Sequence, residues 1–126
     1  MSYAQAAATY QRNAILTASP EKLVKMMYEA AIKHLEKCRT GLADPATSHS
    51  AEVGESFSKA IGIVGELRAS LDQPAGGEVA RDLDRLYEFC LDQITGANSS
   101  RTPDGVEHAL EILRTLQEGW NAIIPA

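Results

Sequence analysis

Cys38 follows His34 by four residues, and this pair is the first place in the chain to look for catalysis. Residues four apart on a helix share a face, so the imidazole could take a proton from the thiol and create a nucleophile. Such a thiol also needs a third group to orient the imidazole and surroundings that lower the thiol pKa. The sequence indicates neither. We therefore interpret Cys38 and Cys90, which both lie within apolar patterns, as free buried thiols in a reducing compartment.

The remaining residues that could carry chemistry lack the necessary spacing. A zinc site gathers Cys and His at short intervals, and a di-iron bundle carries Glu three residues before His on facing helices. None of the histidines, at positions 34, 49 and 108, has a glutamate at that spacing. Residues 74–77 contain the glycines of a phosphate loop without its Lys-Ser/Thr ending or a preceding strand. We predict a protein without metal, cofactor or catalytic activity.

Length, net charge and the distribution of apolar residues exclude further classes of function. The chain has 126 residues, of which 44% are hydrophobic, and this is the length of one globular domain. Its 12 basic and 17 acidic residues give a net charge of −5, and no basic stripe suggests a nucleic-acid partner. No signal peptide and no apolar run of about 20 residues is visible, so we expect a cytoplasmic protein without direct membrane insertion.

Four segments with helical periodicity must position whatever this protein binds with. Ser19, Pro20 and Glu21 form a helix start, and that helix is expected to end near Arg39 with Gly41 as its stop. The next helices are predicted over residues 51–71 and 78–95, with residues 96–101 as a loop. The last begins at Thr102, Pro103 and Asp104. The expected fold is all-α, an antiparallel up-and-down four-helix bundle over residues 19–126. Residues 1–18 form a short, loosely docked N-terminal helical segment.

The apolar stripes of these helices predict the core. Gly62 and Gly65 lie within the second helix, where we expect them to permit close approach of another helix. The stripes of the third and fourth helices are Val79, Leu83, Leu86, Tyr87, Cys90, Leu91 and Ile94, then Val106, Leu110, Leu113, Leu116, Trp120 and Ile123. We interpret Trp120 as a core anchor of the last helix.

The first helix carries an unusually broad apolar face. Its apolar residues cover about two thirds of the circumference, whereas a surface helix needs an arc little wider than about 100°. They are Leu23, Val24, Met26, Met27, Tyr28, Ala30, Ala31, Ile32, Leu35 and Cys38. Either this helix touches several neighbours, or part of its face is left over for a partner. Periodicity alone does not decide between the two.

Several motifs in this order resemble the flagellin-specific secretion chaperones of bacterial flagella, the FliS type. The similarity begins at residues 10–13 and 17–20, continues through residues 23–32, and is strongest over residues 66–72 and 76–80 with Leu83, Leu86 and Tyr87. Residues 116–120 resemble the closing motif of the family. The resemblance covers nearly the whole chain.

The resemblance implies a helical bundle without catalytic activity that binds the disordered C-terminal region of flagellin in the cytoplasm. Such a chaperone blocks premature polymerisation and delivers its client to a component of the flagellar type III export gate. It also implies that the N-terminal segment covers part of the apolar surface when no client is bound. The residues that we expect to contact a partner are Tyr10, Ile15, Leu16, Met26, Val53, Phe57, Ile61, Val64, Leu110 and Leu113.

Two other functions stay open at the level of the sequence. One is a helical adaptor or regulator that binds a different amphipathic helix, which co-purification with flagellin would distinguish from a flagellin chaperone. The other is a small bundle enzyme, which a metal or cofactor assay on the pure protein would reveal.

Overall fold

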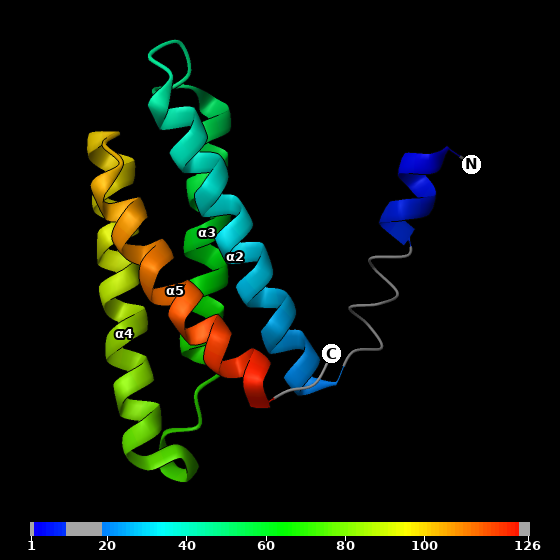
Figure 1. Ribbon diagram of the computed structural model, residues 1–126, viewed down its shortest axis with the longest axis vertical. Coiled ribbons are helices and arrows are strands. Elements are labelled where there is room, and N and C mark those ends of the chain that lie inside the picture. The colour runs from blue at the N-terminus through cyan, green and yellow to red at the C-terminus, as the bar shows by residue number, and fades with distance from the viewer. Residues whose placement is uncertain (1, 10–18, 124–126) are drawn as a thin grey trace.

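The computed structural model describes residues 2–9 and 19–123, where helices are the only regular secondary structure (Figure 1). A short helix covers residues 3–9, and all side chains of residues 2–9 are exposed. Four long helices follow, namely α2 (Pro20–Ala43), α3 (Ala51–Ala69), α4 (Gln73–Ser100) and α5 (Asp104–Ile123). Consecutive long helices run side by side in opposite directions in Figure 1. The predicted all-α antiparallel bundle with a short N-terminal helix is confirmed.

The four long helices close into a ring. α2 packs against α3 and α5, and α4 packs against the same two helices, so α2 and α4 face each other across the diagonal. Aromatic and aliphatic side chains from all four helices fill the centre. The largest fully buried ones are Tyr28, Tyr87, Phe57, Leu35, Leu67, Ile94, Leu110 and Leu113. Cys38 and Cys90 are buried free thiols in this core, as predicted.

The helix starts follow the capping residues in the sequence. Oγ of Ser19 accepts a hydrogen bond from the backbone N–H of Lys22, and Pro20 occupies the first turn, where its missing N–H costs nothing. α3 and α4 use the same device, with Ser50 and Asp72 as their N-caps. These side chains satisfy backbone donors that a helix leaves unpaired at its N-terminus.

The glycines act differently from what the sequence suggested. α2 does not stop at Gly41 but continues to Ala43, and Gly41 lies directly against Val53 of α3. A Cβ atom at Gly41 would stand 2.3 Å from Cγ2 of Val53. The prediction for Gly62 and Gly65 is wrong, since a Cβ atom at either position would meet nothing within 4 Å. Gly41 therefore permits close approach of α2 and α3.

α4 is longer than predicted at its C-terminal end. Its range begins at Gln73, but Gly77 is non-helical, with φ 54° and ψ −130°, so the regular helix starts at Glu78 as predicted and a short turn precedes the break. The helix then runs through the predicted loop to Ser100 and ends at Arg101, which adopts the left-handed conformation. α3 ends slightly early, at Ala69, and α5 begins at Asp104, within the predicted start.

Arg101 explains why α4 ends where it does. Nη1 of its guanidinium donates hydrogen bonds of 3.2 Å to the carbonyl oxygens of Ser48 and Ser50, and the group lies over the ring of Phe57 at 5.8 Å. The backbone N–H of Arg101 donates to the carbonyl of Ala97. One side chain thus ties the end of α4 to the loop between α2 and α3.

Not every residue of the predicted stripes is buried. Val79, Leu86 and Ile123 are 67%, 36% and 70% exposed, so their assignment to the core is wrong. Each lies at the edge of the face that its helix buries. The apolar stripe in the sequence is wider there than the surface that the neighbouring helices cover. Trp120 is half-buried and packs against the core, as its predicted anchoring role requires.

Candidate functional site

The described part of the chain shows no arrangement for metal or thiol chemistry. Within residues 2–9 and 19–123, no three His, Cys, Asp or Glu side chains gather where they could hold a metal ion. Burial raises the pKa of the Cys38 thiol to about 11, the opposite of what a nucleophile at neutral pH requires. Nδ1 of His34 makes no hydrogen bond, so it does not accept the thiol proton. None of the described helices is both long and apolar enough to cross a bilayer.

The surface features that remain are hollows between helices. The first is the α2–α3 groove, which has two sections that share Lys33. Its lower section, of about 460 Å³, is lined mainly by apolar side chains: Leu23, Met26, Met27, Glu29, Ala30, Lys33, His34 and Ile63. Its upper section, of about 680 Å³, is more polar and reaches the loop after α2 through Lys37, Gly41, Asp44, Thr47 and Glu52. Together the sections follow most of the length of α2.

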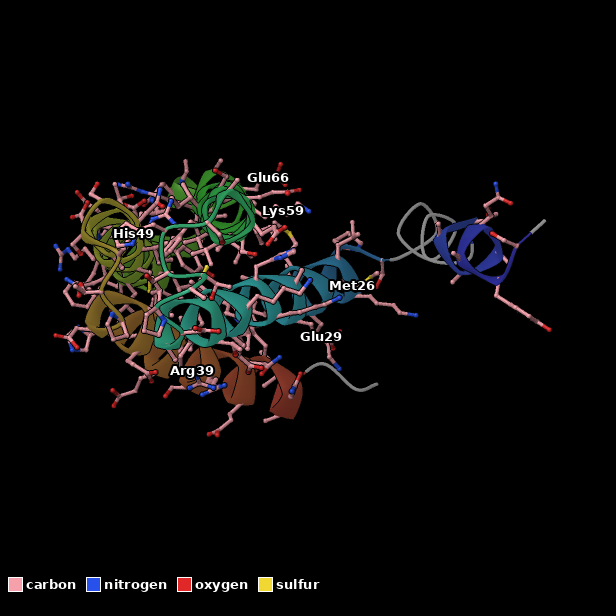
Figure 2. All side chains as sticks on the ribbon, turned by 90° about the horizontal axis from the view of Figure 1, so that it is seen from above. Met26, Glu29, Arg39, His49, Lys59 and Glu66 are labelled. Carbon is pink, nitrogen blue, oxygen red and sulfur yellow. The ribbon has the colours of Figure 1, made fainter. Side chains whose placement is uncertain are left out.

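Figure 2 shows the flank of the bundle on which this groove lies. Lys59 and Glu66 project from α3 on the flank where Met26 lies on α2, whereas Arg39 lies towards α5. Arg39 pairs with Glu107 of α5 at 3.5 Å. α2 is therefore flanked by α5 on one side and by α3 on the other, and the groove runs along its contact with α3.

This arrangement resolves the broad apolar face of α2. One stripe points into the bundle, with Tyr28, Leu35 and Cys38 fully buried. The adjoining stripe, which includes Leu23, Met26, Met27 and Ala30, is half-buried and lines the groove. The sequence left two explanations open, several neighbouring helices or leftover surface. Both are partly correct, because α2 contacts two neighbours and still has apolar surface left over.

A second hollow, which we call the end hollow, lies where all four helices meet near the start of α2. It has a volume of about 380 Å³. Its lining is almost entirely apolar: Val24, Leu67, Leu71, Ala75, Val79, Ala80, Leu83, Tyr87 and Trp120, with Ser70, Asp72 and Gly76 at its side. Val79, one of these lining residues, is exposed, so it belongs to the surface of the hollow and not to the core.

A buried aromatic cluster forms the wall between this hollow and the core. The hydroxyl of Tyr28 hydrogen-bonds that of Tyr87, and the ring of Trp120 lies 6.5 Å from the ring of Tyr28. Burial raises the pKa of both tyrosines, and their mutual hydrogen bond raises that of Tyr87 further. Both hydroxyls therefore stay neutral at physiological pH and hold α2 and α4 together across the diagonal.

The residues predicted to bind a partner fall into three groups. Met26 lines the α2–α3 groove, and Ile61 is half-buried against the core. Val53 is only 5% exposed but lines the upper section of that groove. Burial places four others inside the bundle, where a partner reaches them only if the helices separate: Phe57, Val64, Leu110 and Leu113. Tyr10, Ile15 and Leu16 lie outside the described residues.

Several residues that line the groove were not among the predicted partner contacts. Leu23, Met27 and Ala30 belong to the broad face of α2, so their signal was present but was not assigned to a partner. Ile63 stands one residue from Val64 of the α3 stripe and interrupts its period, which hid its contribution to the groove wall. His34 was considered for catalysis only.

Comparison with known proteins gives a consistent result. The family model for the flagellar protein FliS matches residues 3–126. The flagellar secretion chaperone FliS of Vibrio cholerae is 36% identical over 108 residues, which cover 86% of this chain and 77% of the relative. The flagellar secretion chaperone FliSB of Pseudomonas aeruginosa is 32% identical over 106 residues, which cover 84% of this chain and 82% of the relative. FliS of Salmonella typhimurium is 32% identical over 114 residues, with 90% and 82% covered.

Proposed function

Because the chain belongs to the FliS family of flagellar proteins, whose relatives are secretion chaperones, we propose that it binds the C-terminal region of flagellin and escorts it to export. Binding keeps flagellin from polymerising before export, and the complex is handed to a component of the flagellar type III export gate. The protein acts in the cytoplasm, without a cofactor and without catalysing a reaction.

The observation that carries this proposal is the α2–α3 groove. A flagellin segment that is disordered alone can fold into an amphipathic helix and place its apolar side chains between two helices of the bundle. Met26 and Met27 suit this task, because unbranched thioether side chains adapt to differently shaped partners. Coupled folding of this kind costs several kcal/mol of ordering, so a sizeable contact area remains compatible with release at the export gate.

The two parts of the chain have different roles in this proposal. Residues 19–126 form the body that binds the client, and residues 1–18 form a segment that competes with the client for apolar surface. Tyr3, in the described part of the segment, is 97% exposed, and this exposed aromatic ring supports a segment that docks on apolar surface. The end hollow, with its apolar lining, is a second place where a client or this segment can be received.

Co-purification tests the proposed function. The protein is expressed together with flagellin from the same genome, or with the same flagellin lacking its C-terminal region, and the complexes are separated by size-exclusion chromatography. We expect a complex with the full-length client only, and we expect the complex to resist polymerisation under conditions in which free flagellin forms filaments. Equal recovery of both flagellins would overturn the assignment of the C-terminal region, and recovery of neither would overturn the function.

A further inference from the structure

The α2–α3 groove contains a polar group, the imidazole of His34, whose presence is not explained by the binding of apolar side chains. Nδ1 of His34 is buried and makes no hydrogen bond, although the side chain lines the lower section beside Met27 and Ile63. A neutral imidazole carries its single proton on one ring nitrogen. A proton on Nδ1 would be a buried donor without an acceptor, and buried N–H groups are left unpaired less often than buried acceptors are. The proton therefore belongs on Nε2, at the opposite edge of the ring, where it can meet a partner.

Ammonium groups surround this imidazole. Burial lowers the pKa of His34, and Lys37, Lys59 and Lys33 lower it further, while Glu55 acts in the opposite direction. Lys59 already pairs with Glu55 at 3.1 Å. Lys33 lines both sections of the groove. The junction of the two sections is therefore electropositive, and its imidazole is neutral at pH 7 and able to donate.

Most acidic groups of the groove are paired elsewhere or lie away from this junction. Glu36 of the upper section is held by Arg114 of α5, at the other side of α2. Asp44 comes ten residues after His34, which is about 15 Å along a helix, and Glu52 stands at the start of α3 near that same end. Glu29, one helical turn before Lys33, is the acidic group of the lower section.

We propose that His34 and Lys33 form a carboxylate subsite, at which the client helix places an Asp or Glu side chain while its apolar side chains fill the lower section. The inference rests on the proposed function, because it names a feature of the segment that the groove receives. A carboxylate can accept from an imidazole N–H and an ammonium at once, and such charge-assisted hydrogen bonds are about twice as strong as neutral ones.

The subsite makes the groove selective. An apolar groove alone accepts any amphipathic helix of suitable shape. A helix without the acidic residue would cover the N–H of His34 and the ammonium of Lys33 and leave both unpaired, which lowers its affinity. The groove therefore selects a client that has an acidic side chain next to its apolar stripe.

Substitutions at two positions test the subsite by titration calorimetry with a flagellin C-terminal fragment. His34→Leu removes the donor and keeps an apolar side chain, and we expect it to weaken binding about tenfold, the loss of one charge-assisted hydrogen bond. His34→Gln keeps a neutral N–H donor near the position of Nε2, and it should bind within about threefold of the wild type. Lys33→Met should also weaken binding, whereas Lys22→Met, an exposed lysine of α2 outside the groove, should not.

A pH series gives a readout that a purely structural role of His34 would not change. A client carboxylate raises the pKa of the imidazole in the complex relative to the free protein, so binding takes up protons. Affinity should therefore rise as the pH falls from 7.5 to 6.0, and this rise should be absent in His34→Gln and His34→Leu. Circular dichroism confirms that each variant is folded.

The outcomes separate this inference from the proposed function. If the wild-type protein does not bind the fragment, the proposed function fails and the subsite fails with it. If the wild type binds but folded His34→Leu binds as tightly or more tightly, the proposed function stands and the subsite is wrong. The subsite is equally wrong if replacing each Asp and Glu of the fragment by Asn and Gln, one at a time, never weakens binding.

Discussion

The hydroxyl oxygens of Tyr28 on α2 and Tyr87 on α4 lie 2.5 Å apart in the centre of the bundle. The two helices face each other across the diagonal of the ring, so this hydrogen bond links elements that hardly pack against one another. The ring of Trp120 packs against Tyr28, with ring centroids 6.5 Å apart.

This geometry predicts the stabilities of two phenylalanine variants. Tyr87→Phe leaves the Tyr28 hydroxyl without its partner and should lower the free energy of unfolding by about 1 kcal/mol. Tyr28→Phe leaves the Tyr87 hydroxyl without its partner and should cost about the same. Urea denaturation of the two variants and of the double variant measures the coupling. Strictly additive costs in the double variant would show that the two hydroxyls are not bonded.

The buried thiols predict instability at alkaline pH. Burial raises the pKa of Cys38 to about 11 and that of Cys90 to about 12, whereas both ionise near 8.5 in the unfolded chain. Since the folded state holds these protons more tightly, the stabilisation is complete below pH 8.5 and is lost as the pH rises towards 11. The free energy of unfolding should fall by about 1.4 kcal/mol per pH unit for each thiol.

The control for this effect is the variant with Cys38→Ala and Cys90→Ala. Between pH 8.5 and 9.5, below the usual tyrosine pKa of about 10 in the unfolded chain, urea denaturation of this variant should show a much weaker pH dependence than that of the wild type. The same slope in the variant and the wild type would assign the alkaline loss to other groups.

Two glycines should respond oppositely to replacement by alanine. A Cβ atom at Gly105 of α5 would lie 2.2 Å from the carbonyl oxygen of Gln93, a backbone atom of α4 that cannot turn aside. Gly105→Ala should therefore cost 2 kcal/mol or more, roughly the upper range for overpacking. Gly62→Ala meets open space and should stabilise the helix by about 0.5–1 kcal/mol. Thermal unfolding of the two variants would contradict this if they shifted the midpoint in the same direction.

The N-terminal segment is predicted to compete with the client. Residues 1–18 have few large apolar side chains, so their docking is weak, yet Tyr10, Ile15 and Leu16 prefer an apolar surface to water at about 25 cal/mol per Å² buried. Removing residues 1–14, or Tyr10→Ala, should leave the affinity for flagellin unchanged or raise it modestly, since fewer molecules are closed. The free protein should also aggregate more. A large loss of affinity in a folded truncated protein would make the segment a direct client contact.

The sequence predicted the fold well wherever the physical signal is local. The cap at Ser19 and Pro20 depends on neighbouring atoms, and the structure places the start of α2 there. The structural roles of Gly41 and Arg101 depend on contacts with residues that are distant in the sequence. The helix stop expected at Gly41 is instead a contact with Val53, and Arg101 ends α4 because the carbonyls of the α2–α3 loop hold it. No local pattern contains that information.

The candidate site was predicted less well, because burial and groove lining follow from how helices are placed. Phe57 and Met26 are both apolar residues at helical spacing, yet one is fully buried and the other lines a groove. Only the ring arrangement, in which α2 has neighbours on two sides, distinguishes them. The breadth of the apolar face of α2 was the one sequence feature that indicated leftover surface.

The most direct test of the account is titration calorimetry of a flagellin C-terminal fragment against the wild type and two charge-insertion variants. Ile63→Glu places a carboxylate in the α2–α3 groove, and Phe89→Glu places one on α4, where Phe89 is 45% exposed and outside the groove. With both variants folded by circular dichroism, the account predicts saturable binding for the wild type and for Phe89→Glu. It predicts a loss of about 100-fold or more for Ile63→Glu, because the new carboxylate would stand where the client's apolar side chains pack and would occupy the His34 and Lys33 donors that the client's own carboxylate needs. Undiminished binding by folded Ile63→Glu, or no binding by the wild type, would contradict the account.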